Sequence, residues 1–139
     1  MIDTGISLEK LNDIRTGTLV ENLGIEVTAV AEDGLTGTMP VDERTFQPFG
    51  LLHGGATAAL IETLGSLGSS LLIDHDSQAS VGLELNVNHL RAVRNGTVTC
   101  RVRAVHAGRR THVWQADVMD EEGRAVATGR LTTMVIAKG

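Results

Sequence analysis

The longest weakly charged stretch of the sequence limits most strongly how this chain can fold. Residues 54–72 carry small and apolar side chains over about five helical turns, and their only charged side chain is Glu62. This pattern indicates one helix in the protein interior, because few of its faces are left for water. Burying a carboxylate is costly unless it has a partner or a function. Glu62 is therefore the first candidate functional residue.

A loop rich in proline and glycine precedes this helix and ends in His53-Gly54-Gly55. Glycines at a helix start leave backbone N–H groups accessible, and the helix dipole favours negative charge there. His53 and Glu62 are nine residues apart in the sequence. That spacing places them on opposite sides of the helix and ~13 Å apart along it. If both act in one site, a second copy of the chain must contribute one of them.

Alternation of apolar and polar residues on both sides of the long helix predicts β-strands. The expected elements are a short helix over 7–15, a hairpin over 23–42 that turns at Asp33-Gly34, the long helix, and strands over 81–88, 97–104, 113–119 and 125–135. In the first of these four strands, Val81, Leu83, Leu85 and Val87 are expected on one face. An antiparallel sheet with one apolar face covered by a single helix is an α+β arrangement.

Composition narrows the class of protein. The chain has 139 residues, of which 42% are hydrophobic but only 2% aromatic, so we expect one domain over 1–139 with an aliphatic core. A net charge of -5 provides no basic field for nucleic acid. Cys100 is the sole cysteine, and residues 1–15 lack the features of a secretory signal. We expect a cytoplasmic protein with no nucleic-acid or membrane partner.

Several kinds of site are not supported by the sequence. The five histidines fall at no spacing typical of a metal site, so no metal is expected. Gly65-Ser66-Leu67-Gly68 lies in the middle of the predicted helix and lacks the pattern of a nucleophile elbow, which argues against a serine hydrolase. The glycines and hydroxyl side chains of the long helix, together with Glu62, argue against a membrane span.

The loop and helix together resemble a known family. The sequence Gln47-Pro48-Phe49-Gly50-Leu51-Leu52-His53-Gly54-Gly55, with Glu62 nine residues after the histidine, is similar to the active-site segment of hotdog-fold acyl-CoA thioesterases of the phenylacetate-degradation type. The similarity continues through residues 81–89 and 130–133. It implies a hotdog fold, in which an antiparallel sheet wraps around one long central helix. It also implies hydrolysis of an acyl-CoA thioester to the free acid and CoA.

The resemblance implies roles for individual residues. Glu62 is expected to act as general base or as nucleophile, and the sequence leaves both routes open. The N–H of Gly55 is the expected oxyanion donor, Gln47 and His53 are the expected orienting groups, and Ser66 is expected to position water. Arginine guanidinium groups suit the phosphates of CoA, and a glycine in a turn lets backbone N–H groups approach them. The expected contacts with CoA are Gly82, His89, Leu90, Arg91, Ala92, His106, Gly108, Arg109, Arg110 and Thr111.

The same resemblance implies the partners of the protein. CoA enters as part of the substrate, no cofactor is expected, and the chain is expected to form at least a homodimer and then a homotetramer. The expected acyl group is aromatic, such as 1,4-dihydroxy-2-naphthoyl, hydroxybenzoyl or phenylacetyl. Three alternatives stay open at this point: a non-catalytic module that binds or senses acyl-CoA, a proofreading thioesterase that acts on acyl carrier protein, and a hydratase or dehydratase on the same fold.

Overall fold

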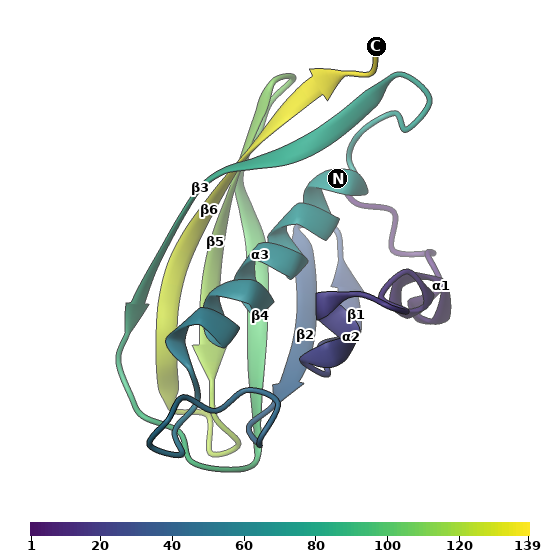
Figure 1. Cartoon of the computed structure of the whole chain (residues 1–139). Helices are drawn as coiled ribbons and strands as arrows, with labels where there is room; N and C mark the ends of the chain where they lie inside the picture. Colours follow the sequence, from purple (N-terminus) through teal and green to yellow (C-terminus); the bar gives the residue numbers. More distant parts are fainter.

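The structure is a computed structural model that describes residues 1–139. One antiparallel sheet of six strands curves around a long helix, and two short helices lie near the N-terminus (Figure 1). The elements are α1 (Leu8–Asp13), α2 (Leu19–Asn22), β1 (Glu26–Ala31), β2 (Gly34–Pro40), α3 (Gly54–Ser70), β3 (Gln78–His89), β4 (Thr97–Ala107), β5 (Thr111–Met119) and β6 (Ala125–Ala137). The strand order is β1-β2-β4-β5-β6-β3, so β1 and β3 are the edge strands. The predicted α+β arrangement is confirmed.

Glycines allow α3 to approach the sheet closely. A Cβ placed on Gly65 would lie 2.5 Å from Cδ2 of Leu131, and one on Gly68 would lie 2.7 Å from the ring of Trp114. Carbon atoms that are not bonded do not approach this closely, so any larger residue would push the helix off the sheet. The small residues of the long apolar stretch therefore set the distance between helix and sheet.

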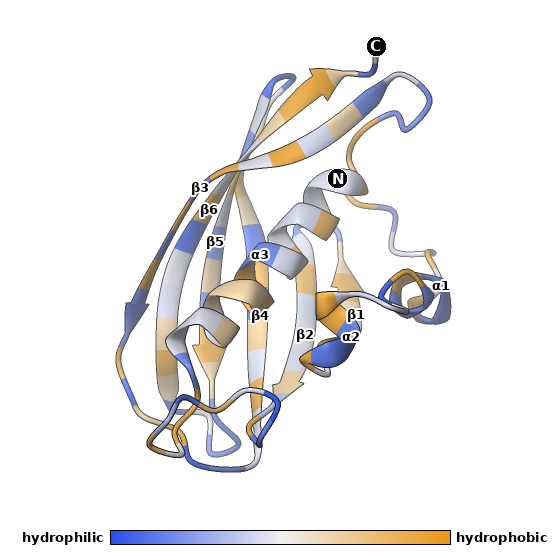
Figure 2. Ribbon diagram, viewed as in Figure 1, coloured by the Kyte–Doolittle hydropathy of each residue, from blue (hydrophilic) through white to orange (hydrophobic).

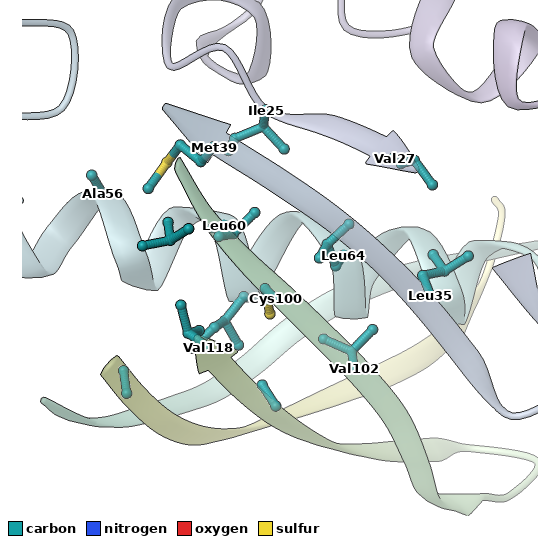
Figure 3. Packing of buried hydrophobic residues seen from close by; sticks show 14 of the residues in the cluster. Ile25, Val27, Leu35, Met39, Ala56, Leu60, Leu64, Cys100, Val102 and Val118 are labelled. Carbon is teal, nitrogen blue, oxygen red and sulfur yellow. The ribbon is translucent and has the colours of Figure 1, made fainter. Parts of the chain in front are cut away.

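The core lies between α3 and the inner faces of the strands. Leu60, Ile61 and Leu64 of α3 are completely buried there, among aliphatic side chains from β2, β4 and β5 (Figure 3). Apolar and polar residues alternate along these strands, as their sequence pattern predicts (Figure 2). The buried Trp114 donates its indole N–H to Oγ of Ser69 at 2.8 Å, so this polar atom of the core has a partner.

The N-terminal part of the chain differs from the prediction in detail. The first helix begins after Ser7 as expected. A single further helical turn, α2, ends with Leu23 as its C-cap, so β1 begins at Glu26 instead of at the predicted Leu23. Gly24 follows with a φ of +69°, a conformation that favours glycine and that ends this turn before β1. A one-turn helix has no repeating pattern of its own, which explains why the sequence did not predict it.

Strand β3 contains a β-bulge between Gly82 and Glu84. Val81 pairs with Met134, whereas Leu85 pairs with the buried Leu131, and residues that pair directly share one face of a sheet. The predicted common face for Val81, Leu83, Leu85 and Val87 is therefore wrong, because the extra residue of the bulge reverses the alternation. As a result Gly82 pairs with the buried Thr133 and faces α3.

Candidate active site

Glu62 lies in the middle of α3, where it is half-buried instead of completely enclosed. Its Oε1 accepts a hydrogen bond from Oγ of Ser66, one helical turn later, at 3.0 Å. The carboxylate also lies directly against β3, because a Cβ placed on Gly82 would be 2.5 Å from Oε1 of Glu62. The structure thus brings together three of the predicted site residues, and the absence of a side chain at Gly82 makes room for the carboxylate.

Glu62 and Ser66 line a cavity of about 420 Å³ between α3 and the N-terminal segment of the chain. Leu11, Ile14 and Val20 line the same cavity. A carboxylate at an apolar cavity suits a reaction at the polar end of an otherwise apolar ligand. The sequence pattern did not indicate that residues before β1 contribute to this wall.

A second cavity of about 400 Å³ lies at the start of α3. Its lining includes Gln47, Gly54 and the segment His89 to Ala92, all of them in or next to predicted site segments. His89 contacts the helix start closely, since its Nε2 would be 2.8 Å from a Cβ on Gly54. Within one chain, Gln47 and Glu62 therefore line two different cavities.

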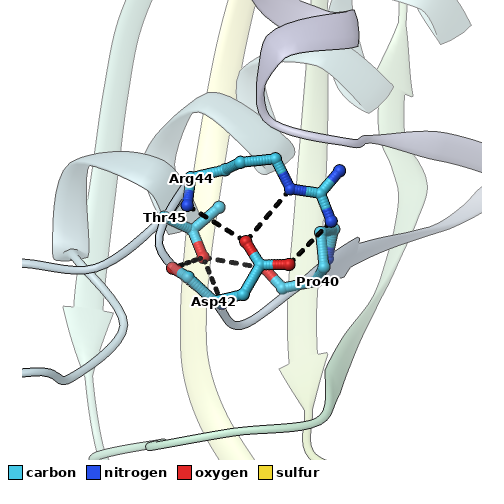
Figure 4. A network of polar contacts seen from close by, with 4 residues as sticks. All are labelled: Pro40, Asp42, Arg44 and Thr45. Atoms are coloured by element: carbon cyan, nitrogen blue, oxygen red, sulfur yellow. Dashed lines mark hydrogen bonds and ion pairs between the residues drawn. The ribbon is translucent and has the colours of Figure 1, made fainter.

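The loop that carries Gln47 is held by a compact polar network (Figure 4). Nε and Nη2 of Arg44 donate to the carboxylate of Asp42 at 3.0 and 2.6 Å, and this guanidinium holds the pKa of Asp42 below its ordinary value. The buried Thr45 donates its hydroxyl to the carbonyl of Pro40 at 2.8 Å. Its own carbonyl accepts the N–H of His53 at 2.8 Å, so the network connects the end of β2 to the start of α3.

Two hydrogen bonds orient the polar groups at the start of α3. The side-chain oxygen of Gln47 accepts the backbone N–H of Phe49, which leaves the amide NH₂ of Gln47 free to donate. Nδ1 of His53, the N-cap residue, accepts the N–H of Gly55 at 2.7 Å. The predicted oxyanion donor is thus bonded to His53 in this conformation, and a ligand must replace this bond to reach it.

The arginines predicted to contact CoA have no partner within the chain. Arg15, Arg44, Arg101 and Arg124 all form ion pairs with carboxylates. Three exposed arginines in the two predicted segments form no ion pair or side-chain hydrogen bond within the chain: Arg91, Arg109 and Arg110. The same holds for Arg94, just after the first segment, and for Arg103 on β4. Their guanidinium groups are available to an anionic ligand.

The two basic segments lie at opposite ends of the sheet. Residues 89–92 lie at the end of β3 near the start of α3, whereas residues 106–111 span the turn from β4 to β5 at the other end (Figure 1). In this hairpin the N–H of Gly108 donates to the carbonyl of Thr111 at 2.9 Å, and His106 lies against Gly108. One chain therefore does not bring the predicted CoA contacts together.

No group of three or more His, Cys, Asp or Glu side chains is placed to hold a metal ion. No helix combines the length and the apolar character that crossing a membrane requires.

Comparison with known proteins identifies the family. The family described as "Thioesterase superfamily" matches residues 49–127. A protein named "Proofreading thioesterase EntH" from Cronobacter turicensis is 50% identical over 131 residues, which cover 94% of this chain and 95% of that protein. The "1,4-dihydroxy-2-naphthoyl-CoA hydrolase" of Escherichia coli is 45% identical over 131 residues, which cover 94% of this chain and 96% of that protein.

A solved structure supports the same conclusion. The crystal structure of a mutant of thioesterase PA1618 from Pseudomonas aeruginosa has a TM-score of 0.96 and 44% sequence identity, and the alignment covers 99% of both chains. The curved antiparallel sheet and the central helix α3 are thus those of hotdog thioesterases. This chain belongs to the thioesterase superfamily and is an enzyme of the thioesterase type.

Proposed function

We propose that this protein hydrolyses an acyl-CoA thioester to the free acid and CoA. The observation that carries the proposal is the Glu62 carboxylate, which Ser66 holds at 3.0 Å beside an apolar cavity. As general base, Glu62 takes a proton from water, whose oxygen attacks the thioester carbonyl carbon while the C–S bond breaks and CoA leaves as thiolate. As nucleophile, Glu62 attacks the carbonyl carbon, the C–S bond breaks with loss of CoA thiolate, and water then hydrolyses the resulting mixed anhydride to the free acid and the Glu62 carboxylate. Both routes use the same carboxylate.

The complete site requires two copies of the chain. Strand β3 is an edge strand, and Val81 and Leu83 on it are 42% and 52% exposed, so it offers both backbone groups and apolar surface to a second copy. Antiparallel pairing of two β3 strands about a two-fold axis places opposite ends of the two chains side by side. Glu62 and Ser66 of one copy then meet Gln47 and the start of α3 of the other.

The same arrangement accounts for the separated basic segments. Hairpin 106–111 of one copy comes next to residues 89–92 of the other, so the unpaired arginines of both segments surround one CoA phosphate region. Gly82 lies at the carboxylate end of this site. A homotetramer of two such dimers is the assembly that we propose.

The free amide of Gln47 and the N–H of Gly55 are the proposed donors to the thioester oxygen. His53 holds the Gly55 N–H in place before the substrate arrives, and the developing oxyanion replaces its Nδ1 as acceptor. Loss of one oxyanion donor typically costs about 3 kcal/mol of transition-state stabilisation.

The acyl group is proposed to be aromatic, because aliphatic side chains form part of the lining of the cavity beside Glu62 and a relative with 45% identity is named a hydrolase of 1,4-dihydroxy-2-naphthoyl-CoA. The chain is proposed to be one hotdog domain over 1–139 that acts in the cytoplasm without a metal. No cofactor is proposed, because CoA is part of the substrate. A second candidate substrate is an acyl group on a carrier protein, because a relative with 50% identity is named a proofreading thioesterase.

Replacing the carboxylate tests this function. Glu62→Gln is expected to lower kcat for thiol release from aromatic acyl-CoA by a factor of about 10²–10⁴, with little change in binding of the substrate. Glu9→Gln, the same change at an exposed glutamate on α1, is the control. Turnover of Glu62→Gln close to that of the wild type would exclude Glu62 from the mechanism. Parallel assays with acyl-CoA and acyl carrier protein distinguish the two carriers.

A further inference from the structure

The cavity beside Glu62 continues toward the C-terminal half of α3. Ser66 and Ser70 follow Glu62 at intervals of one helical turn and line the same cavity. Across from them, Ser80 of β3 also lines it. Because β3 runs antiparallel to the direction of α3 in the fold, the residues before Gly82 lie beside this distal part of the cavity (Figure 1).

Most polar side chains around this cavity are already hydrogen-bonded within the chain. Both ends of the Asn12 amide bond to the backbone of Val27 at 2.9 Å, and Thr63 donates to the carbonyl of Ala59 at 2.7 Å. Side chains of the lining with such internal partners are Asn12, Arg15, Thr18, Thr63, Ser66 and Ser70.

Ser80 is the exception among these polar residues. Its side chain is half-buried, lines the cavity and has no hydrogen-bond partner in the chain. A hydroxyl group that is partly removed from water loses free energy unless water or a ligand replaces the lost hydrogen bonds. The distal cavity thus presents apolar surface and one free hydroxyl group to whatever occupies it.

The position of Ser80 relative to the carboxylate fixes which part of a ligand it can reach. Ser80 pairs with Val135 and Gly82 with Thr133 in a regular part of β3, so both residues point toward α3. Two residues along a strand span ~7 Å, and Gly82 is the residue that touches the Glu62 carboxylate. With a carbonyl carbon beside Glu62, a substituent meta or para on an aromatic ring projects toward Ser80, whereas an ortho substituent stays beside the carbonyl.

We propose that Ser80 is a specificity-determining residue whose hydroxyl hydrogen-bonds a hydroxyl substituent at the distal side of an aromatic acyl group. The inference rests on the proposed thioesterase function and adds the residue that selects, among aromatic acyl groups, those with one hydroxyl group meta or para to the carbonyl. The aliphatic side chains of the lining, such as Leu11 and Val20, would contact the apolar part of the ring.

The test compares four substrates, benzoyl-CoA and its 2-, 3- and 4-hydroxy derivatives, by thiol release. The wild type is expected to have a higher kcat/KM for the 3- or 4-hydroxy substrate than for benzoyl-CoA. Ser80→Ala is expected to lower this ratio about three- to tenfold, which is the range of one neutral hydrogen bond. Thr63 lines the same cavity, but its hydroxyl already donates to the carbonyl of Ala59. Thr63→Val is therefore expected to leave the ratio unchanged.

Failure of the inference differs from failure of the proposed function. If the wild type hydrolyses these thioesters but Ser80→Ala leaves the ratio unchanged, or lowers it only for the 2-hydroxy substrate, Ser80 does not select the substituent. If Thr63→Val lowers the ratio as much as Ser80→Ala, the effect comes from the cavity as a whole and the assignment of Ser80 is wrong. If the wild type hydrolyses no acyl-CoA or carrier-bound thioester, the proposed function itself is wrong.

Discussion

The contact between Gly82 and Glu62 predicts the effect of a single methyl group. Gly82→Ala places a Cβ 2.5 Å from Oε1 of Glu62, whereas ordinary contact begins near 3.4 Å, so the carboxylate must move by about 0.9 Å. The φ of Gly82 lies outside the left-handed region, so alanine fits the backbone. Because the atom that must move is the end of a flexible side chain, the fold is expected to survive with a small change in Tm.

The displaced carboxylate should be a poor catalyst. A misplacement of about 1 Å costs about 10²-fold in rate when a reacting group must be aligned. The movement also disturbs the hydrogen bond from Ser66. We therefore expect Gly82→Ala to lower kcat by about 10²-fold in the thiol-release assay, while circular dichroism and Tm remain close to those of the wild type.

A matched control tests whether the effect comes from the place of the added methyl group or from a glycine-to-alanine change in general. Gly5→Ala adds the same methyl group where its nearest neighbour is the exposed Asp3 side chain at 3.2 Å, so kcat is expected to be unchanged. A folded Gly82→Ala protein with the kcat of the wild type would refute the reasoning, because it would show that the position of the Glu62 carboxylate does not limit the reaction.

Two further predictions concern buried groups. Burial, and to a lesser degree the nearby Asp117, raises the pKa of Cys100 to about 12. Native protein should therefore not react with Ellman's reagent at pH 8, whereas protein in denaturant should show one reactive thiol per chain. Reaction of the native protein would contradict this prediction. Burial lowers the pKa of His112, so the unfolded chain binds a proton near pH 6.5 that the folded chain does not. The free energy of unfolding should therefore fall as pH drops below about 6.5, by at most about 1.4 kcal/mol per pH unit from this group. Urea titrations at several pH values measure this free energy, and its change with pH should be smaller for His112→Gln than for the wild type. An equal pH dependence in both proteins would contradict the assignment to His112.

Much of the fold could be predicted from the sequence because most elements have one clearly apolar face. The alternation of residues 97–104 and 113–119 matches β4 and β5, and the glycine-rich apolar stretch matches α3 closely at its start. The bulge at Gly82 was not predicted, since a bulge inserts one residue without a composition signal of its own. It matters for the site, because the reversed alternation is what turns Gly82 toward Glu62.

The candidate site was predictable only where its residues are close in the sequence. Glu62 and Ser66 lie one helical turn apart, so their hydrogen bond follows from helix geometry. Ser80 was missed because its importance depends on which other polar groups of the cavity already have partners. That information arises only from tertiary contacts, such as the bonds between Asn12 and Val27.

The most direct test of the shared site is complementation between two defective chains. Glu62→Ala and Gln47→Ala chains with different affinity tags are co-expressed, and heterodimers are purified over both tags. If one copy supplies Glu62 and the other Gln47, each heterodimer contains one intact site and should have about half of the wild-type kcat per dimer. Verified heterodimers no more active than either parent variant would contradict the account, because both residues would then act within a single chain.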